Sequence, residues 1–267
     1  MSTVAIIQAR MTSTRLPGKV LMEVMGRPML GYQIEHVERA RRVDRIVLAT
    51  TTNTTDDPLA AFAESAGIGL YRGSENDVLG RVAEAARISL AKGTPAAIVR
   101  LTADCPLIDP ELIDAVVDCL ANSAPPIDYA SNAIPRCWPI GLDVEAMTFD
   151  ALMQADLDAS DSYDREHVTP FLYRQPDRFR IGHVPSPEPL SHHRWTLDEA
   201  ADFDLLSAIL TALYPTNPNF GYRDVLNLLA RRPDLNSLNA RVAQKIRRFE
   251  DIVDKALARG GDDAGSR

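Results

Sequence analysis

Three cations and a glycine follow the first apolar run of the chain, at a spacing that suits a polyphosphate. The run is Val4 to Ile7, and the polar segment after it contains Arg10, Arg15, Gly18 and Lys19. Cationic side chains offset phosphate charge, and loop N–H groups donate hydrogen bonds to phosphate oxygens. The segment lacks the residues of a P-loop and of a GxGxxG turn, so it predicts a phosphate-binding loop of another kind. The alternative is an ordinary solvated loop.

Two carboxylates follow stretches that the pattern predicts to be buried strands. Asp104 comes after the apolar stretch 96–101, and Pro106 keeps that strand from continuing. A side chain at the carboxyl end of a parallel strand faces the crevice in which such sheets bind ligands. Asp198 ends a second, shorter apolar stretch, just before a predicted helix. Both have a structural alternative, since Asp104 could cap a turn and Asp198 could be a helix N-cap.

The elements that must position these residues alternate between short apolar strands and helical patterns. In the first half of the chain, strands are expected at 4–7, 46–49, 68–71 and 96–101, and helices at 29–41, from 57, at 77–91 and from Asp109 to 120. This alternation predicts a mostly parallel sheet with helices on both faces and right-handed crossovers. After residue 121 the pattern is less regular: strands at 127–130 and 143–147, a helix at 149–156, a strand and a helix over 194–210, and helical character over 220–258.

The bulk properties narrow the class of protein. The chain has 267 residues and a net charge of −8, which argues against sequence-independent binding to nucleic acid. No segment has the roughly 18 apolar residues of a membrane helix, and the first apolar run is too short for a signal peptide. Three cysteines, without metal-binding spacing, indicate a reducing compartment. We therefore expect a cytoplasmic protein with no nucleic-acid or membrane partner.

Residues 4 to 30 resemble the N-terminal signature of the cytidylyltransferases that activate acidic sugars, roughly (I/V)xARxxSTRLPGKxL followed by a GxP step. The form QARMTSTRLPGKVL is most similar to the spore-coat polysaccharide protein F branch. The resemblance extends over about 4–210. It implies a three-layer α/β/α sandwich with a Rossmann-like, mostly parallel sheet of the nucleotide-diphospho-sugar transferase type. We expect one domain at 1–258, a small acceptor and dimer insertion near 132–190, and a disordered tail at 259–267.

The same resemblance assigns roles around the nucleotide. It implies that CTP places its triphosphate on the loop that contains Gly18, and that Asp104 and Asp198 hold Mg²⁺ as the cofactor. Two carboxylates suit Mg²⁺, which also takes substrate phosphates and waters as ligands. Asp202, one helical turn further, would support Asp198. The residues expected to carry the catalysis are Lys19, Arg10 and Asp104.

Cytosine recognition is implied for two further positions. The segment GSENDVLGR resembles the family loop whose arginine helps to read the base, which indicates Arg81. In the sugar-acid relatives a glutamine stands two residues before the first metal-binding aspartate, and here that residue is Thr102. A hydroxyl makes fewer contacts than an amide, so discrimination between bases is expected to be weaker.

Two polar segments, 131–145 and 162–172, resemble the family regions that contact the acceptor. Two of their residues, at 143 and 145, would share one face of a strand. The alternatives are a helix-surface ion pair between residues 165 and 166 and a structural role for the histidine at 167. The residues that the resemblance places at the acceptor are Asn132, Arg136, Asp143, Glu145, Arg165, Glu166 and His167.

The function implied is transfer of CMP from CTP to a sugar or sugar acid of surface polysaccharide synthesis, with release of pyrophosphate, by a homodimer. A phosphonate or another non-sugar acceptor would also fit. The alternatives are a nucleotide-sugar-dependent glycosyltransferase, for which Asp143-x-Glu145 is a weak metal motif, and a nucleotide-binding protein without catalytic activity. Pyrophosphate release distinguishes the first alternative, because a glycosyltransferase releases none.

Overall fold

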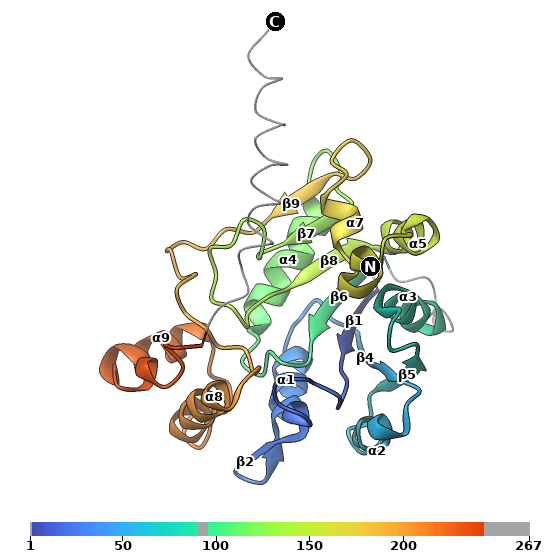
Figure 1. The fold of residues 1–267 in the computed structure, drawn as a ribbon. Helices are drawn as coiled ribbons and strands as arrows, with labels where there is room; N and C mark the ends of the chain where they lie inside the picture. The colour runs from blue at the N-terminus through green and yellow to red at the C-terminus, as the bar shows by residue number, and fades with distance from the viewer. Residues whose placement is uncertain (1, 90–95, 243–267) are drawn as a thin grey trace, which may run out of the picture.

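The computed structural model describes residues 2–89 and 96–242 (Figure 1). Its main sheet has seven strands in the order β5-β4-β1-β6-β8-β7-β9. The pairs that β1 makes with β4 and β6, and the pairs β4–β5 and β7–β9, are parallel, whereas β8 is antiparallel to both of its neighbours. The strands are β1 (Thr3–Gln8), β4 (Arg45–Thr51), β5 (Gly69–Gly73), β6 (Ala97–Thr102), β7 (Tyr129–Ser131), β8 (Glu145–Thr148) and β9 (Ile181–His183).

Helices cover both faces of this sheet, which confirms the expected three-layer sandwich. Alternate residues of β1 enter opposite cores: Ala5 and Ile7 join one, Val4 and Ile6 the other. The first core also contains side chains of α1, α2, α4, α8 and α9, and the second contains side chains of α3, α5 and the short helix α7 (Pro170–Tyr173). The longer helices are α1 (Met29–Glu38), α2 (Asp57–Ser65), α3 (Val78–Ile88), α4 (Pro110–Asn122), α5 (Phe149–Asp158), α8 (Ala200–Leu213) and α9 (Tyr222–Arg231).

Local sequence signals account for several helix starts. Asp109 caps α4 as predicted, because its carboxylate accepts hydrogen bonds from the backbone of Glu111 and Leu112, and Pro110 supplies a preset first turn. The alternative for Asp198, a helix N-cap, does not hold. The N-cap of α8 is Glu199, whose backbone N–H donates to Asp202 at 3.0 Å.

The strand expected at the start of 194–210 is also wrong. Only an isolated bridge between Ile140 and Arg194 forms there. The backbone of this extended segment bonds to two loops instead: Trp195 N to Ile140 O at 2.6 Å, and Leu197 N to Asp104 O at 2.8 Å. The segment therefore links two loops and adds no strand to the sheet.

Several short elements have no clear sequence signal. They are β2 (Glu23–Val24), β3 (Arg27–Pro28), α6 (Ser162–His167), α7 (Pro170–Tyr173) and the 3₁₀ turns η1 (Lys19–Leu21), η2 (Thr54–Asp56) and η4 (Leu235–Ser237). The segment expected to be an insertion, 132–190, contributes β8 and β9 to the main sheet. The helical pattern expected beyond residue 242 and the tail at 259–267 lie outside the described residues.

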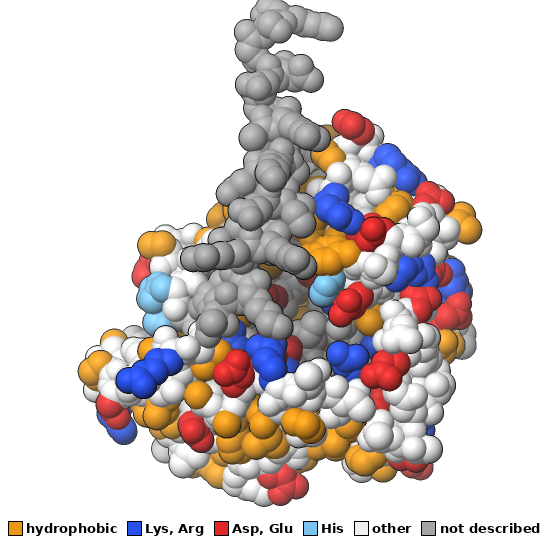
Figure 2. Space-filling view, viewed as in Figure 1, with side chains coloured by type: hydrophobic (Ala, Val, Ile, Leu, Met, Phe, Trp, Pro, Cys, Tyr) orange, Lys and Arg blue, Asp and Glu red, His pale blue; other side chains and the backbone are white. Residues whose placement is uncertain are grey.

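Charges are interleaved on the face shown in Figure 2, where Lys and Arg side chains alternate with Asp and Glu. The ion pairs among the described residues include Arg178 with Asp158 at 2.6 Å and Arg87 with Asp156 at 3.0 Å. The absence of nucleic-acid binding stays a prediction that rests on the net charge. Among the described helices, none combines the length and the apolar character that a membrane span requires.

Candidate active site

Three segments meet at the carboxyl edge of the sheet. Strands β1 and β6 run in register, so that Gln8 and Thr102 end side by side. The cationic loop follows β1, and the turn that holds Asp104 follows β6. The backbone carbonyl of Asp104 accepts hydrogen bonds from Leu197 N and from Thr196 Oγ1 at 3.2 Å, which brings the third segment to the same place. Parallel strand order thus assembles the site at the edge where such sheets bind ligands.

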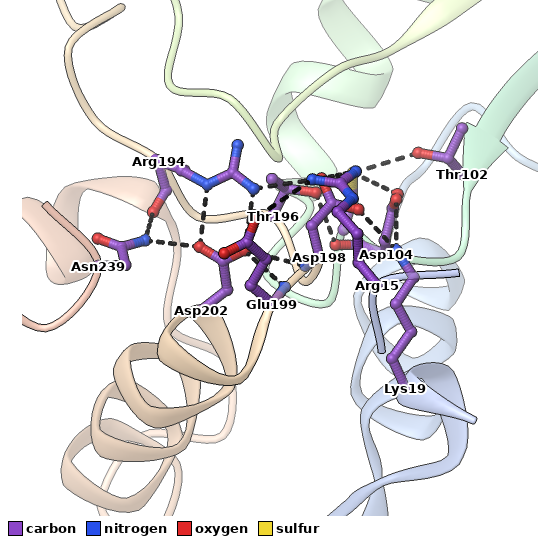
Figure 3. Close-up of polar contacts among 11 residues, drawn as sticks. Arg15, Lys19, Thr102, Asp104, Arg194, Thr196, Asp198, Glu199, Asp202 and Asn239 are labelled. Carbon is purple, nitrogen blue, oxygen red and sulfur yellow. Dashed lines mark hydrogen bonds and ion pairs between the residues drawn. The ribbon is translucent and has the colours of Figure 1, made fainter. Parts of the chain in front are cut away.

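Lys19 lies between the two predicted metal ligands (Figure 3). Its Nζ is 3.1 Å from Asp104 Oδ2 and 2.8 Å from Asp198 Oδ1, and its side chain is buried. Gly18 makes this placement possible, because it adopts the left-handed conformation (φ 72°) and donates its N–H to Met11 O at 2.9 Å. The two aspartates and the lysine predicted from sequence therefore form one contact group.

The electrostatics keep this group charged. Burial lowers the pKa of Lys19, but the attraction of Asp104 and Asp198 outweighs it and the net shift is upward. Burial raises the pKa of Asp198, but Lys19, Arg15 and Arg194 outweigh it and the net shift is downward. Lys19 and Asp198 are thus a charged pair at neutral pH.

The other cations of the loop occupy two different places. Arg15 Nη2 is 2.9 Å from Asp198 Oδ2, at the same centre as Lys19. Arg10 is nearly half exposed and lies 3.4 Å from Glu75 Oε1, on the loop between β5 and α3. The structure therefore brings Arg15 and Lys19 to the carboxylates and Arg10 to the Glu75 side of the loop.

Asp56 anchors this loop from beneath. Its Oδ1 accepts the N–H of Met11 at 2.8 Å, and its Oδ2 accepts from Thr50 Oγ1 at 2.9 Å and Thr51 Oγ1 at 2.6 Å. The side chain is fully buried. Burial raises its pKa, but the hydrogen bonds from Thr51, Met11 and Thr50 outweigh it and lower the pKa overall. A buried carboxylate thus ties the loop after β1 to the end of β4.

We expect Asp56→Asn to lower the free energy of unfolding by about 3 kcal/mol at pH 7, because an amide NH₂ would face donors that the carboxylate now satisfies. Because the folded pKa is depressed, this contribution is complete above about pH 4 and is lost as the pH falls through the folded pKa. Urea unfolding of both proteins at pH 7 and pH 3 measures the effect, which should shrink in acid. Asp57→Asn, at an exposed neighbouring position, is the control, and an equal loss in both variants would contradict the anchor role.

Arg81 belongs to the Glu75 side of the loop. It is buried, and it donates from Nη1 to the carbonyl of Ser74. Burial, reinforced by repulsion from Arg10, lowers its pKa. Its buried Nε has no hydrogen-bond partner among the described residues. A buried donor without a partner is costly, and the role of Arg81 in reading the base stays a prediction.

A cavity of about 270 Å³ opens beside the carboxylates. Arg136 and Asp143 form a bidentate ion pair in its wall, at 2.6 and 2.8 Å. Thr102 also lines it, with Oγ1 3.4 Å from Cys105 Sγ, whereas Arg81 does not. The described lining residues are Thr102, Asp104, Cys105, Arg136, Ile140, Gly141, Asp143, Arg194, Thr196 and Asp198.

Two predicted acceptor residues have internal partners in the structure. Asn132 is fully buried, donates to Leu142 O at 2.7 Å and accepts from Val144 N at 2.8 Å. Glu145 pairs with Arg100 and accepts from Tyr129 at 2.6 Å. Asp143 precedes β8 and Glu145 begins it, so only Asp143 reaches the cavity wall.

The predicted residues of α6 also lie away from the cavity walls that the described residues form. Arg165 binds Asp77 and Asp156 and thereby fastens α6 to α3 and α5, which replaces the alternative ion pair with its neighbour. Glu166 and His167 are exposed, and the His167 ring packs on Tyr163 at 4.3 Å. Acceptor contacts of Asn132, Glu145 and these α6 residues stay predictions.

Sequence reasoning missed Arg194. Its Nη2 lies 3.2 Å from Asp198 Oδ2 and 2.9 Å from Asp202 Oδ2. The spacing of one arginine and two aspartates at intervals of four residues was the available signal. The supporting role predicted for Asp202 agrees with these contacts.

The donor set fits a divalent cation that binds together with a substrate. The carboxylates of Asp104 and Asp198 converge on a single cationic atom, Lys19 Nζ. Among the described residues, no group of three or more His, Cys, Asp or Glu side chains is placed to hold a metal. Two carboxylates that rely on phosphate and water for the remaining ligands are what Mg²⁺ prefers.

A cationic loop facing two carboxylates at the edge of a mostly parallel sheet defines a nucleotidyltransferase-type site. The family model for cytidylyltransferases matches residues 4–209, and the chain belongs to this family. It is thus a member of a class of enzymes that use CTP for nucleotidyl transfer. This confirms the resemblance seen in the N-terminal segment.

Individual proteins that are similar to this chain support the family assignment. The chain is 35% identical over 247 residues to an uncharacterised protein of Methanocaldococcus jannaschii, covering 92% of this chain and 97% of that protein. It is 32% identical to the spore coat polysaccharide biosynthesis protein SpsF of Bacillus subtilis, over 86% of this chain and 94% of that one. A solved cytidylyltransferase from Leptospira borgpetersenii superposes with a TM-score of 0.84 at 30% identity, covering 91% of this chain and 100% of that chain.

Proposed function

We propose that this protein transfers CMP from CTP to a sugar or sugar acid used in surface polysaccharide synthesis, and releases pyrophosphate. The observation that carries the proposal is Lys19, held between Asp104 and Asp198 on a loop with two further cations. Family membership supplies the CTP-dependent transfer. The polysaccharide context rests on the name of the Bacillus subtilis relative.

The triphosphate would lie along the loop, with its charge offset by Arg10, Arg15 and Lys19. Asp104 and Asp198 would hold Mg²⁺, which, when bound, neutralises charge on phosphate oxygens. An acceptor oxygen attacks the α-phosphorus as the bond to pyrophosphate breaks, without a covalent intermediate. Because such transition states are loose, the side chains act mainly by positioning the reactants and stabilising charge. Lys19 is central, since it is buried and already directed at the carboxylates.

The acceptor would enter the cavity beside these carboxylates. Arg136 and Asp143, paired across its wall, offer both donors and acceptors to hydroxyl groups. The segment 132–190 supplies this wall, and the proposal includes a homodimer formed through the same segment. Size-exclusion chromatography with light scattering tests the dimer.

The glycosyltransferase alternative finds no support in the geometry. Its weak metal motif requires Asp143 and Glu145 to act together. Asp143 is paired with Arg136 in the cavity wall, whereas Glu145 is paired with Arg100 outside that wall. The two carboxylates therefore serve separate ion pairs.

Pyrophosphate release tests the proposal directly. The protein is incubated with CTP, Mg²⁺ and single acceptors: an acidic sugar, a neutral sugar and a phosphonate. Acceptor-dependent pyrophosphate together with a CMP conjugate is the expected result for a sugar. Release with the phosphonate alone would show that the acceptor is a phosphonate and not a sugar. No release with any acceptor would contradict the transfer reaction.

We expect CTP to be preferred over UTP, ATP and GTP, because a site with buried polar groups rejects bases that leave those groups unpaired. In this proposal the guanidinium of Arg81, whose Nε has no hydrogen-bond partner among the described residues, donates to the cytosine carbonyl. Discrimination against UTP should be modest, since Thr102 offers one hydroxyl where an amide would make two contacts, and Thr102→Gln should raise the CTP:UTP ratio of kcat/KM. Thr216→Gln, at an exposed position, is the control. Equal or better turnover with ATP or GTP would overturn cytosine selection but not nucleotidyl transfer.

A further inference from the structure

A chain of hydrogen bonds leads from Asp198 away from the cavity and ends at Asn239 (Figure 3). Arg194 Nη2 lies 3.2 Å from Asp198 Oδ2 and 2.9 Å from Asp202 Oδ2, and Arg194 Nε donates to Asp202 Oδ1 at 2.9 Å. Asn239 Nδ2 donates to Asp202 Oδ1 and to the carbonyl oxygen of Arg194, both at 2.9 Å. The Arg194 guanidinium thus binds the carboxylates of both Asp198 and Asp202. The Asn239 amide binds the backbone carbonyl of Arg194 and the carboxylate of Asp202.

The residues of this network are shielded from water. Asp202 is fully buried, and Arg194 and Asn239 are more than nine-tenths buried. Asp202 also accepts the backbone N–H groups of Asp198 and Glu199 at 3.0 Å. Water has little access to replace a lost partner, so removal of one donor leaves an unsatisfied polar group that the network must rearrange to satisfy.

The position of Asn239 in the chain sets it apart from the rest of the site. It lies beyond α9 and just after η4, outside residues 4–209 that the family model matches. From this C-terminal part of the described chain, the Asn239 side chain donates hydrogen bonds to both Arg194 and Asp202. The C-terminal part of the described chain therefore touches the network that orients Asp198.

We infer that Asn239 is a positioning residue: through Asp202 and Arg194 it fixes the direction in which the Asp198 carboxylate faces Lys19 and Asp104. This inference rests on the proposed function, in which Asp198 is one of two carboxylates for Mg²⁺. Groups that orient a metal ligand typically contribute 10- to 100-fold to metal affinity or activity. Asn239 acts through its neighbours and needs no contact with substrate.

The test compares three variants in the full-length protein. Asn239→Ala removes both donated bonds, and Asn239→Ser restores a single donor. Asn236→Ala is the matched control, since Asn236 is an exposed asparagine three residues earlier, on η4. The readouts are the Mg²⁺ concentration for half-maximal pyrophosphate release, the KM for CTP, and Mn²⁺ binding in the presence of CTP without acceptor, followed by electron paramagnetic resonance.

For Asn239→Ala we expect about a 10-fold rise in the half-maximal Mg²⁺ concentration and a matching loss of Mn²⁺ affinity, with a nearly unchanged KM for CTP. Asn239→Ser should fall between the wild type and Asn239→Ala, and Asn236→Ala should match the wild type. If Asn239→Ala does not fold, the Mg²⁺ requirement of Asn239→Ser decides the question.

Two outcomes would overturn the inference. One is a folded Asn239→Ala protein with wild-type Mg²⁺ and Mn²⁺ responses. The other is a loss of activity that only follows a loss of stability in urea, with an unchanged Mg²⁺ requirement. Failure of the wild-type protein to release pyrophosphate from CTP would instead contradict the proposed function, so the two failures are distinguishable.

Discussion

Lys19→Ala is expected to lower the rate of pyrophosphate release from CTP by about 100-fold or more while the fold is retained. The ammonium group is buried and lies 2.8 and 3.1 Å from the two carboxylates, where the triphosphate would meet them. Loss of one such preorganised electrostatic contact typically costs this much in rate. The measurement is kcat with saturating CTP and Mg²⁺, alongside circular dichroism to confirm the fold.

The control for Lys19 is Arg41→Ala. Arg41 is also cationic, but its side chain is 85% exposed and pairs with Asp114 far along the chain. Its removal should leave pyrophosphate release within a factor of about two, as expected for an exposed ion pair. Unchanged turnover in Lys19→Ala would remove Lys19 from the site and with it the proposed phosphate position.

The second large effect is expected from the carboxylates. Asp104→Asn and Asp198→Asn keep the side-chain size but remove the charge that would hold Mg²⁺, so turnover should collapse and the Mg²⁺ requirement should rise in both. Asp198→Asn should also lower the free energy of unfolding more, because Asp198 is in ion pairs with Arg15 and Arg194 as well as Lys19. Kinetics over a range of Mg²⁺ concentrations and urea unfolding measure the two effects.

Asp204→Asn serves as the matched control, because Asp204 is an exposed aspartate on α8, two residues after Asp202. It should behave as the wild type in both measurements. Wild-type kinetics in Asp198→Asn, combined with an inactive Asp104→Asn, would show that one carboxylate is sufficient and would reject the two-carboxylate site.

Much of the fold followed from local patterns. The β-branched run of β1, the helix signals at Asp109-Pro110 and the alternation of strands with helices predicted the elements and the three layers, because the hydrophobic period and the capping chemistry act over a few residues. The prediction of a strand near Arg194 was wrong because a local pattern does not specify the hydrogen-bond partners of the backbone. An extended apolar stretch has the same local signal whether its backbone joins a sheet or, as here, bonds to the loops at Ile140 and Asp104.

The candidate site was also predicted in part from the sequence and decided in part by the tertiary structure. The sequence by itself determined that the cationic loop and Asp104 stand at the ends of buried strands, whereas the strand expected before Asp198 does not form. That was enough to predict that Asp104 lies at the crevice where such sheets bind ligands, and the structure adds that β1 and β6 are neighbours in register, so that Lys19 meets Asp104. Only the tertiary structure decided which polar groups become partners across long separations. Lys19 reaches Asp198 over 179 positions of sequence, and Asn239 reaches Asp202 over 37. Such partners are selected by burial, because a polar group enclosed by the fold must find its hydrogen bonds among whichever residues the packing brings beside it.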